Sequence, residues 1–407
     1  MRPSIKSKYN KPRILFICED VALSHVVRPL VLAQSIQDSH EICLAAGDKY
    51  AELLESSDVN YRSIWTLSAD LFIERLAKGQ DGWYVEDFSQ EAEADIALIK
   101  EIEPDLVIGD LRWSLGISAA VTKTPYLSFL NSHWSPYYTG TCPPMELPIT
   151  KLLGVKLTEL LIPILAPILL KKYAKPFNTV RREYGLEEVF DYLHIGVCAD
   201  WVAYLDIPSL GPTRAAPNTH KYLGPVDWSP DVLYPDWWEN LPDDKPIAYV
   251  SMGSTGKISY IHELVETLSD MGMTVMLATS GRYEQKGFGD NVYVAEYLPG
   301  LDACRRSDLV VCNGGTGAIY QAIQAEVPIL GIPTNGDQYF AMGSVENNKA
   351  GILVRSTHVN SKRIRSAGSK LLSVKSYKQR CSELKAELNQ YDAITRFTEF
   401  VDSLFRN

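Results

Sequence analysis

The residues with the clearest chemical potential form a glycine-rich turn, Asn313-Gly-Gly-Thr-Gly317. It follows Leu309 to Cys312, a short apolar run typical of a buried strand, and precedes residues 318–325, which keep helical spacing without a breaker. Glycines let the backbone approach a ligand closely, and the first amides of a helix are unpaired donors at the positive end of its dipole. The turn therefore predicts an anion site suited to phosphate, although a tight connection that binds nothing would have the same pattern.

Two polar residues follow the next apolar run, residues 327–333. Asp337 and Gln338 come where that strand would end. Because parallel strands bring their carboxyl ends to one edge of a sheet, both side chains should lie beside the glycine-rich turn. A carboxylate and an amide there suit the hydroxyl groups of a sugar.

A histidine and an aspartate form a candidate acid–base pair near the start of the chain. His25 follows the strand-like run 13–18 and begins a helical segment, whereas Asp110 ends the strand-like run 105–110. Both belong to the carboxyl edge of a doubly wound sheet, where the carboxylate could fix the imidazole tautomer. A helix N-terminus disfavours imidazolium, which keeps the ring able to accept a proton near pH 7. Alternatively, His25 forms only local hydrogen bonds and Asp110 caps the helix that begins near Leu115.

Composition bounds the class of protein. A chain of 407 residues predicts two domains, and 46% hydrophobic with 22% charged residues is a soluble globular balance. The net charge of -10 argues against a nucleic-acid partner. Seven cysteines without a Cys-x-x-Cys pair indicate buried thiols in a reducing compartment. The first 13 residues are polar and basic, so we expect a cytoplasmic protein without a signal peptide.

Three further segments concern the environment of a substrate. His133 and Trp134 follow the strand-like run 124–130 and are candidates for an acceptor pocket or for a packed loop. Residues 68–90 carry aromatic residues among glycines and acids and predict an irregular loop. Residues 152–170 are the most apolar stretch, but charged residues and prolines interrupt it, which argues against a membrane span. That stretch predicts a kinked helix pair that lines an apolar acceptor cleft or rests on a lipid surface.

Residues 312–351 together carry a family resemblance. The Asn-Gly-Gly-x-Gly turn, the prolines at 328 and 333, the Asp337-Gln338 pair and the closing Lys-Ala-Gly351 resemble the nucleotide-sugar signature of UGT-like (GT1-type) glycosyltransferases. The bacterial small-molecule and natural-product branch resembles the chain most. The chain departs from this pattern in three places. Asn313 stands where the family has His, Ala318 where it has Thr, and the glycines that usually precede His25 are missing.

The resemblance implies an α/β chain with the GT-B fold, in which two Rossmann-like, doubly wound domains face each other across a cleft. An acceptor-binding domain would span residues 12–228, followed by a Pro- and Trp-rich linker at 229–245. A nucleotide-sugar domain would span residues 246–390, and a helix in residues 391–407 would return to the first domain.

The resemblance also assigns roles. His25 would be the catalytic base, oriented by Asp110. The donor would be held by three sets of residues around the glycine turns: Gly253, Ser254 and Thr255; Tyr297 and Leu298; and Asn313, Gly314, Gly315, Thr316, Gly317, Gln321, Asp337 and Gln338. His133 and Trp134 would contact the acceptor.

The predicted activity is inverting transfer of a sugar from a UDP- or dTDP-sugar to a hydroxyl of a hydrophobic small molecule or lipid. The chain has no Asp-x-Asp triplet, so we expect neither a metal ion nor another cofactor. We expect a monomer or homodimer without a transmembrane segment and with possible peripheral membrane contact. Two alternatives stay open: a non-catalytic GT-B protein that binds a sugar nucleotide or assists a true transferase, and a sugar-nucleotide epimerase on the same fold.

Overall fold

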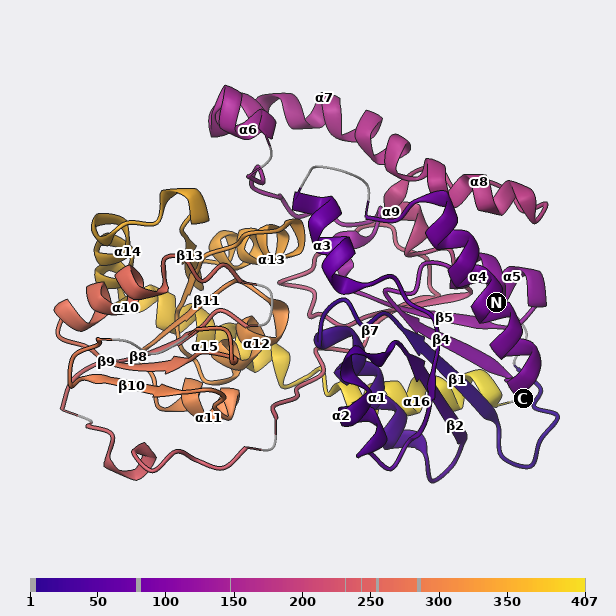
Figure 1. The fold of residues 1–407 in the computed structure, drawn as a ribbon, viewed down its shortest axis with the longest axis horizontal. Helices are drawn as coiled ribbons and strands as arrows, with labels where there is room; N and C mark the ends of the chain where they lie inside the picture. Colours follow the sequence, from indigo (N-terminus) through magenta and orange to yellow (C-terminus); the bar gives the residue numbers. More distant parts are fainter. Residues whose placement is uncertain are drawn as a thin grey trace. The chain divides into compact units, whose positions relative to one another are not determined.

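The computed structural model describes residues 5–77, 82–146, 148–230, 232–242, 244–253, 256–283 and 287–406. These residues form two compact units (Figure 1). The first unit contains residues 5–139, 160–226 and 391–406, and the second contains residues 140–159 and 227–390. Residues 140–159, placed with the acceptor domain from sequence, therefore belong to the second unit.

The first unit is built on a seven-stranded parallel sheet with strand order β3-β2-β1-β4-β5-β6-β7. Its strands are β1 Arg13–Cys18, β2 Glu41–Ala46, β3 Asn60–Ser63, β4 Leu106–Asp110, β5 Tyr126–Leu130, β6 Trp201–Tyr204 and β7 His220–Tyr222. Its helices include α1 Ser24–Ile36, α2 Ala51–Glu55, α3 Ala69–Ala77, α4 Val85–Ile102, α5 Leu115–Thr122, α8 Lys175–Glu183, α9 Tyr192–Ile195 and α16 Ala393–Phe405. The strand order reverses between β1 and β4, the usual position of a ligand site in such sheets.

The second unit repeats this architecture with six parallel strands in the order β10-β9-β8-β11-β12-β13. These strands are β8 Ile247–Ser251, β9 Thr274–Ala278, β10 Val292–Ala295, β11 Leu309–Cys312, β12 Ile329–Gly331 and β13 Gly351–Leu353. Its helices include α6 Pro148–Leu153, α10 Ile261–Asp270, α11 Gly300–Arg305, α12 Thr316–Gln324, α13 Gly336–Asn347, α14 Ser361–Ser373 and α15 Lys375–Leu388. The predicted pair of doubly wound α/β sheets is confirmed.

Two local predictions were wrong. Residues 68–90 are not simply irregular, because α3 lies within them and α4 begins at Val85. The Asp87 carboxylate caps α4 by accepting the Tyr84 amide at 2.7 Å, and it also pairs with Arg75. The predicted kinked helix pair at 152–170 breaks at a different place than its prolines suggest: α6 ends at Leu153, Gly154 has φ +78°, and α7 Val155–Tyr173 continues through Pro163 and Pro167.

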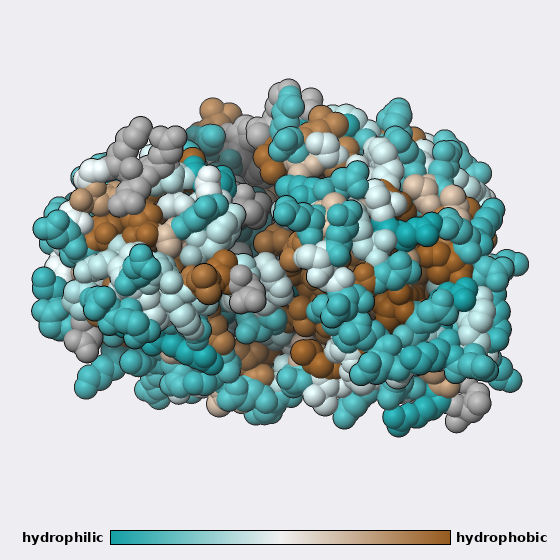
Figure 2. Space-filling model, turned by 60° about the horizontal axis from the view of Figure 1, so that its bottom comes forward, coloured by the Kyte–Doolittle hydropathy of each residue, from teal (hydrophilic) through white to brown (hydrophobic). Residues whose placement is uncertain are grey.

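The polar character of the chain is visible at its surface. On the face drawn in Figure 2, hydrophilic side chains predominate and hydrophobic ones form groups between them. None of the helices in the described part of the chain is long and apolar enough to cross a membrane.

The C-terminal helix α16 packs into the first unit, as predicted. Phe397 is fully buried, and its ring centroid lies 6.3 Å from that of Phe16 in β1 and 5.6 Å from that of Phe129 in β5. The last helix therefore completes the core of the N-terminal sheet.

We expect Phe397→Ala to destabilise the first unit by about 3–5 kcal/mol, because it leaves a cavity beside the rings of Phe16 and Phe129. Ile394→Ala, at a half-exposed position of the same helix, is the matched control and should cost much less. Urea unfolding followed by tryptophan fluorescence measures both. Equal losses would show that α16 is not part of this core.

Candidate active site

The structure brings His25 and Asp110 together at the carboxyl edge of the first sheet. His25 lies in the first turn of α1 and Asp110 is the last residue of β4. The imidazole Nδ1 lies 2.7 Å from Oδ1 of Asp110, whose side chain is 1% exposed, whereas that of His25 is 21% exposed. Arg28 Nη2 also lies 2.9 Å from Nδ1. Because a carboxylate only accepts, the shorter contact with Asp110 is a hydrogen bond when Nδ1 carries the proton, and Nε2 is then the basic nitrogen.

Arg28 completes this pair and was not predicted. It donates from Nε to Oδ2 of Asp110 at 3.0 Å and from Nη2 to Oδ1 at 2.7 Å. Arg28 lies three residues after His25, on the same face of α1, so helical spacing was the available signal. The two side chains together compensate a carboxylate that burial would otherwise strongly destabilise.

The same network fixes the loop after β5. Arg28 Nη1 donates to Oδ1 of Asn131 at 2.8 Å, and Asn131 Nδ2 donates to Oδ1 of Asp206 at 3.2 Å. Asp206 in turn accepts from the Ser132 hydroxyl at 2.8 Å. His133, a predicted acceptor residue, is 5% exposed, which favours the packed-loop alternative for its side chain.

Trp134, the other predicted acceptor residue, is only partly buried. It belongs to an aromatic group in which its ring lies 6.3 Å from that of Tyr192, and the Tyr192 ring lies 6.3 Å from that of Tyr173. Trp134 follows β5, whereas Tyr173 ends α7 and Tyr192 begins α9, so three separate segments contribute to this group of rings.

Side-chain anchors take the place of the missing glycines before His25. Asp20 accepts from the Lys49 amide and the Thr66 hydroxyl, each at 3.0 Å. The Glu19 amide donates to the carbonyl of Asp110 at 3.2 Å. Because these contacts hold the loop from several sides, its shape does not depend on glycine conformations.

The side chain of Glu19 enters a fully buried group of charges. Arg112 pairs with Glu19 and, at 2.9 Å, with Asp95, and its Nη1 lies 3.8 Å from Glu91. Burial raises the pKa of Glu19 to about 7 and that of Glu91 well above its ordinary value. One guanidinium faces three carboxyl groups, so this cluster keeps a proton near neutral pH.

In the second unit, the glycine-rich turn connects β11 to α12 as predicted. Gly314 has φ +83°, and a Cβ there would lie 2.6 Å from Met342, so the position requires glycine. The Gly315 amide donates to Oδ1 of Asn313 at 3.0 Å and is therefore not free, which corrects the prediction for this amide. Among the described residues, the amides of Thr316, Gly317 and Ala318 in the first turn of α12 have no partner. The helix keeps open donors for an anion.

The loop after β8 lies beside this turn. A Cβ on Gly253 would lie 3.5 Å from Nδ2 of Asn313, and Arg282 donates to the Gly253 carbonyl at 2.9 Å. Arg282 was not predicted, because it lies in an irregular loop after β9 without a motif. Its guanidinium brings positive charge to the glycine turns. The predicted Ser254 and Thr255 lie outside the described residues.

A cavity of about 550 Å³ opens at the ends of β9 and β10. Its lining includes Thr279, Arg282, Tyr283 and Glu296. The predicted Tyr297 and Leu298 directly follow Glu296; Tyr297 is exposed and Leu298 is buried. The cavity therefore lies next in the chain to the segment that the family resemblance assigns to the donor, but Tyr297 and Leu298 themselves do not line it.

Two predicted sugar ligands have other partners. Gln321 Nε2 donates to the Ser229 hydroxyl at 3.0 Å and to the Trp228 carbonyl at 3.2 Å, so it holds the segment that leads into the second unit. Gln338 is buried, and its Oε1 accepts from the Thr334 amide at 2.8 Å. Asp337 lies in the first turn of α13, where its position still suits a hydroxyl ligand.

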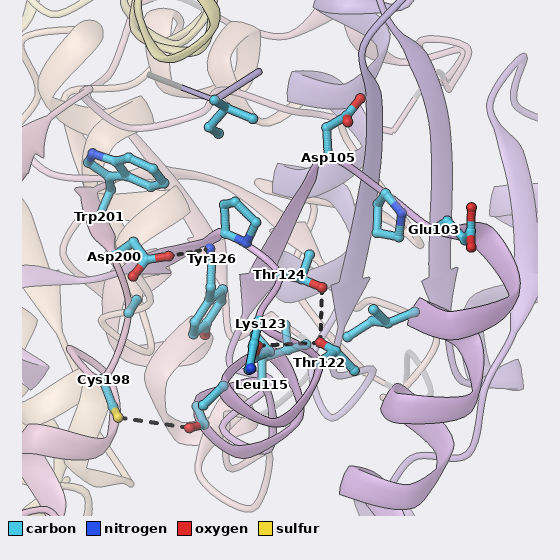
Figure 3. Close-up of a pocket in the computed structure, with 18 of the residues that line it drawn as sticks. Glu103, Asp105, Leu115, Thr122, Lys123, Thr124, Tyr126, Cys198, Asp200 and Trp201 are labelled. Atoms are coloured by element: carbon cyan, nitrogen blue, oxygen red, sulfur yellow. Dashed lines mark hydrogen bonds between the residues drawn. The ribbon is translucent and has the colours of Figure 1, made fainter. Parts of the chain in front are cut away.

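A larger cavity, of about 1390 Å³, lies at the opposite edge of the first sheet (Figure 3). It is lined by Tyr126 and Trp201, the first residues of β5 and β6, and by Thr124 and Asp200 just before them. Ligands of open α/β sheets bind at the carboxyl ends of the strands, so we do not assign this cavity to the acceptor. No group of three or more His, Cys, Asp or Glu within the described residues could hold a metal ion.

We expect Glu19→Gln to flatten the pH dependence of stability, since glutamine still accepts from Arg112 but cannot ionise. A carboxyl whose pKa rises from 4.5 to about 7 on folding stabilises fully below pH 4.5 and loses this contribution as the pH rises through 7. The free energy of unfolding of the variant should therefore rise, relative to that of the unmodified chain, as the pH increases from 4.5 to 7. Urea unfolding at a series of pH values measures the effect, with exposed Glu93→Gln as control. Parallel plots of unfolding free energy against pH for the unmodified chain and for Glu19→Gln would contradict this prediction.

Comparison with known proteins shows the family of this chain. Residues 262–399 match the family model of the erythromycin biosynthesis protein CIII-like C-terminal domain. A PGL/p-HBAD biosynthesis rhamnosyltransferase of Mycobacterium bovis is 38% identical over 374 residues, which cover 91% of this chain and 83% of the relative. A relative from the same organism is called an inactive PGL/p-HBAD biosynthesis glycosyltransferase; it is 35% identical over 63% of this chain and 71% of its own length.

The fold has solved counterparts. The spinosyn rhamnosyltransferase SpnG in complex with thymidine diphosphate superposes with a TM-score of 0.69 at 16% identity, over 95% of this chain and 99% of that one. This likeness shows the fold, and the sequence relatives show the family. The chain belongs to the family of GT1-like bacterial natural-product glycosyltransferases with the GT-B fold.

Proposed function

We propose that this glycosyltransferase moves a sugar from a UDP- or dTDP-sugar to a hydroxyl of a hydrophobic small molecule, with inversion at the anomeric carbon. The observation that carries the proposal is the 2.7 Å contact between His25 Nδ1 and Asp110 Oδ1 at the carboxyl edge of the first sheet. A partly exposed imidazole whose Nδ1 donates to a buried carboxylate is suited to take a proton from an alcohol at Nε2.

The proposed reaction is a single displacement. His25 Nε2 accepts the hydroxyl proton as the oxygen forms a bond to the anomeric carbon, and the bond from that carbon to the diphosphate oxygen breaks. The electron pair leaves with the diphosphate. A single displacement inverts the centre, so an α-linked donor gives a β-glycoside. Asp110 steadies the imidazolium that forms.

The second unit would hold the departing diphosphate. The open amides of Thr316, Gly317 and Ala318 supply partial positive charge, and Arg282 supplies a full one. This arrangement requires no metal ion, in keeping with the missing Asp-x-Asp triplet. We infer that Arg282 compensates for the neutral side chain at Asn313.

The relatives favour a deoxyhexose donor. The 38% identical relative is named a rhamnosyltransferase, and the structural counterpart SpnG binds thymidine diphosphate. We therefore propose dTDP-rhamnose as the first donor to test, with UDP-glucose as the comparison. The partly buried rings of Trp134, Tyr192 and Tyr173 favour an aromatic or otherwise apolar acceptor.

A second candidate function is a non-catalytic sugar-nucleotide-binding protein. The inactive relative and the neutral Asn313 favour it. Such a protein would bind the donor but would not transfer its sugar. It would also show no slow hydrolysis of the donor that is lost when His25 is replaced.

We expect His25→Ala to lower the rate of sugar transfer or donor hydrolysis by about a hundredfold or more, since general-base catalysis contributes on that scale. His262→Ala is the matched control, because this histidine is exposed on α10 and pairs with Glu266. Product formation from dTDP-rhamnose and UDP-glucose, measured by mass spectrometry, checks the result. Turnover that survives the change at position 25 would rule out this base, and no turnover with intact donor binding would favour the non-catalytic candidate.

We expect Arg282→Gln to weaken nucleoside diphosphate binding about tenfold, because it removes a charge-assisted contact. Thymidine and uridine diphosphates serve as the ligands in a thermal-shift titration. At a hundred times Kd, a true ligand stabilises the folded chain by about 2.7 kcal/mol. Arg305→Gln, an exposed arginine that pairs with Asp302, is the control. Equal affinity of both variants would remove Arg282 from the donor site.

A further inference from the structure

The outer face of α7 is apolar. Leu157, Leu160, Ile164 and Ile168 follow one another at spacings of three and four residues, so they share one side of the helix. Their exposed fractions are 45%, 72%, 65% and 65%. A helix on the surface of a globular protein normally turns charged and polar residues to water. This stripe therefore needs a partner that removes it from water.

The described part of the chain does not supply that partner. Thr158 is the only buried residue of α7; Leu161 and Leu165 are half-buried, and Leu169, outside the stripe, is 40% exposed. The helix thus packs loosely on one side and leaves leucine and isoleucine side chains in solvent on the other. Isolated exposed apolar residues are normal, but a continuous stripe along about three turns is not.

Positive charge surrounds the stripe although the chain as a whole is acidic. Lys156, Lys171, Lys172 and Lys175 are exposed at its two ends, and Glu159 is the exposed acid among them. The net charge of the whole chain is -10, so this helix is a local cationic region. An anionic surface would be attracted here and repelled by most of the remaining molecule.

An exposed aromatic ring extends the apolar surface at the end of α7. Phe190 is 65% exposed, and Lys171 Nζ lies 4.5 Å from the centre of its ring. An apolar ring beside a lysine, whose stem is apolar and whose charge can reach outward, is the arrangement found where proteins meet lipid head groups.

We propose that α7 docks the protein on the surface of a bilayer that contains anionic lipids. The apolar stripe enters the boundary between head groups and acyl chains, and the lysines contact the head-group phosphates. No described helix is long and apolar enough to cross a membrane, so α7 lies in the plane of the surface. This docking does not depend on the proposed sugar transfer.

The test uses the full chain and flotation with two kinds of vesicle. One is pure phosphatidylcholine and the other an equal mixture of phosphatidylcholine and phosphatidylglycerol. We expect binding to the mixed vesicles at low salt, at least about tenfold stronger than to the neutral ones, since each lysine at an anionic surface contributes about fivefold. Molar salt should reduce this difference, because the Debye length falls to about 3 Å.

Two variants separate the apolar contribution to vesicle binding from the electrostatic one. Leu160→Gln/Ile164→Gln/Ile168→Gln keeps good helix formers but removes the apolar stripe, and it should weaken binding to mixed vesicles by at least about a hundredfold. Leu233→Gln/Val374→Gln/Ile394→Gln is the matched control, because these three residues are exposed and lie outside α7. Lys171→Gln/Lys172→Gln should weaken binding to the mixed vesicles and leave binding to neutral ones unchanged.

Three results would overturn the proposal. The first is that the unmodified chain binds neither vesicle at low salt, and the second is that the stripe variant, folded by circular dichroism, binds as tightly as the control. The third result combines three observations: the unmodified chain is a dimer in light scattering, the stripe variant is a monomer, and neither of them binds vesicles. This result would show that the stripe contacts a second copy of this chain. If the stripe variant does not fold, the lysine pair and the salt titration still decide the matter.

Discussion

The carboxylate of Asp110 constrains the whole carboxyl edge of the first sheet. It is almost fully buried, and an ionised carboxylate in that position costs several kcal/mol unless donors surround it. His25 and Arg28 supply those donors from adjacent turns of α1. The start of α1 is therefore set by electrostatics as well as by the sheet. One of the two donors is a partly exposed imidazole, so the group that compensates the buried carboxylate is also the group that we propose as the base.

The buried cluster around Arg112 fixes the loop that leads to His25. Its carboxyl groups come from the loop after β1 and from α4, and none of them reaches solvent. The cluster ties Glu19 to the protein interior, while the Glu19 amide bonds to the Asp110 carbonyl. The position of the loop that delivers His25 is thus fixed from two sides. The family resemblance rests on glycines in this loop. It could not show how this chain, which lacks those glycines, holds His25 in place.

Sequence patterns predicted what depends on local periodicity and on sheet topology. Apolar runs gave the strands, and the rule that parallel strands end at one edge brought His25 to Asp110. The same reasoning could not assign side-chain partners. Gln321 and Gln338 were predicted to hold the donor, but the Gln321 amide donates to the distant Ser229 hydroxyl and the Gln338 side-chain carbonyl accepts from the nearby Thr334 amide. The start of α4 at Val85 falls inside the stretch predicted to be irregular, because it depends on the side chain of Asp87.

Asn313 shows why residue type alone misjudges a site. An asparagine in place of histidine suggests a donor without charge, yet its Oδ1 accepts from the Gly315 amide and its Nδ2 faces the Gly253 turn. The side chain therefore joins two glycine turns and shapes the cradle more than it contributes charge to it. A cradle shaped in this way still needs a cation, because helix amides supply only partial charge. Arg282 donates to the Gly253 carbonyl from a third loop, and under the proposed function it supplies the charge that Asn313 lacks.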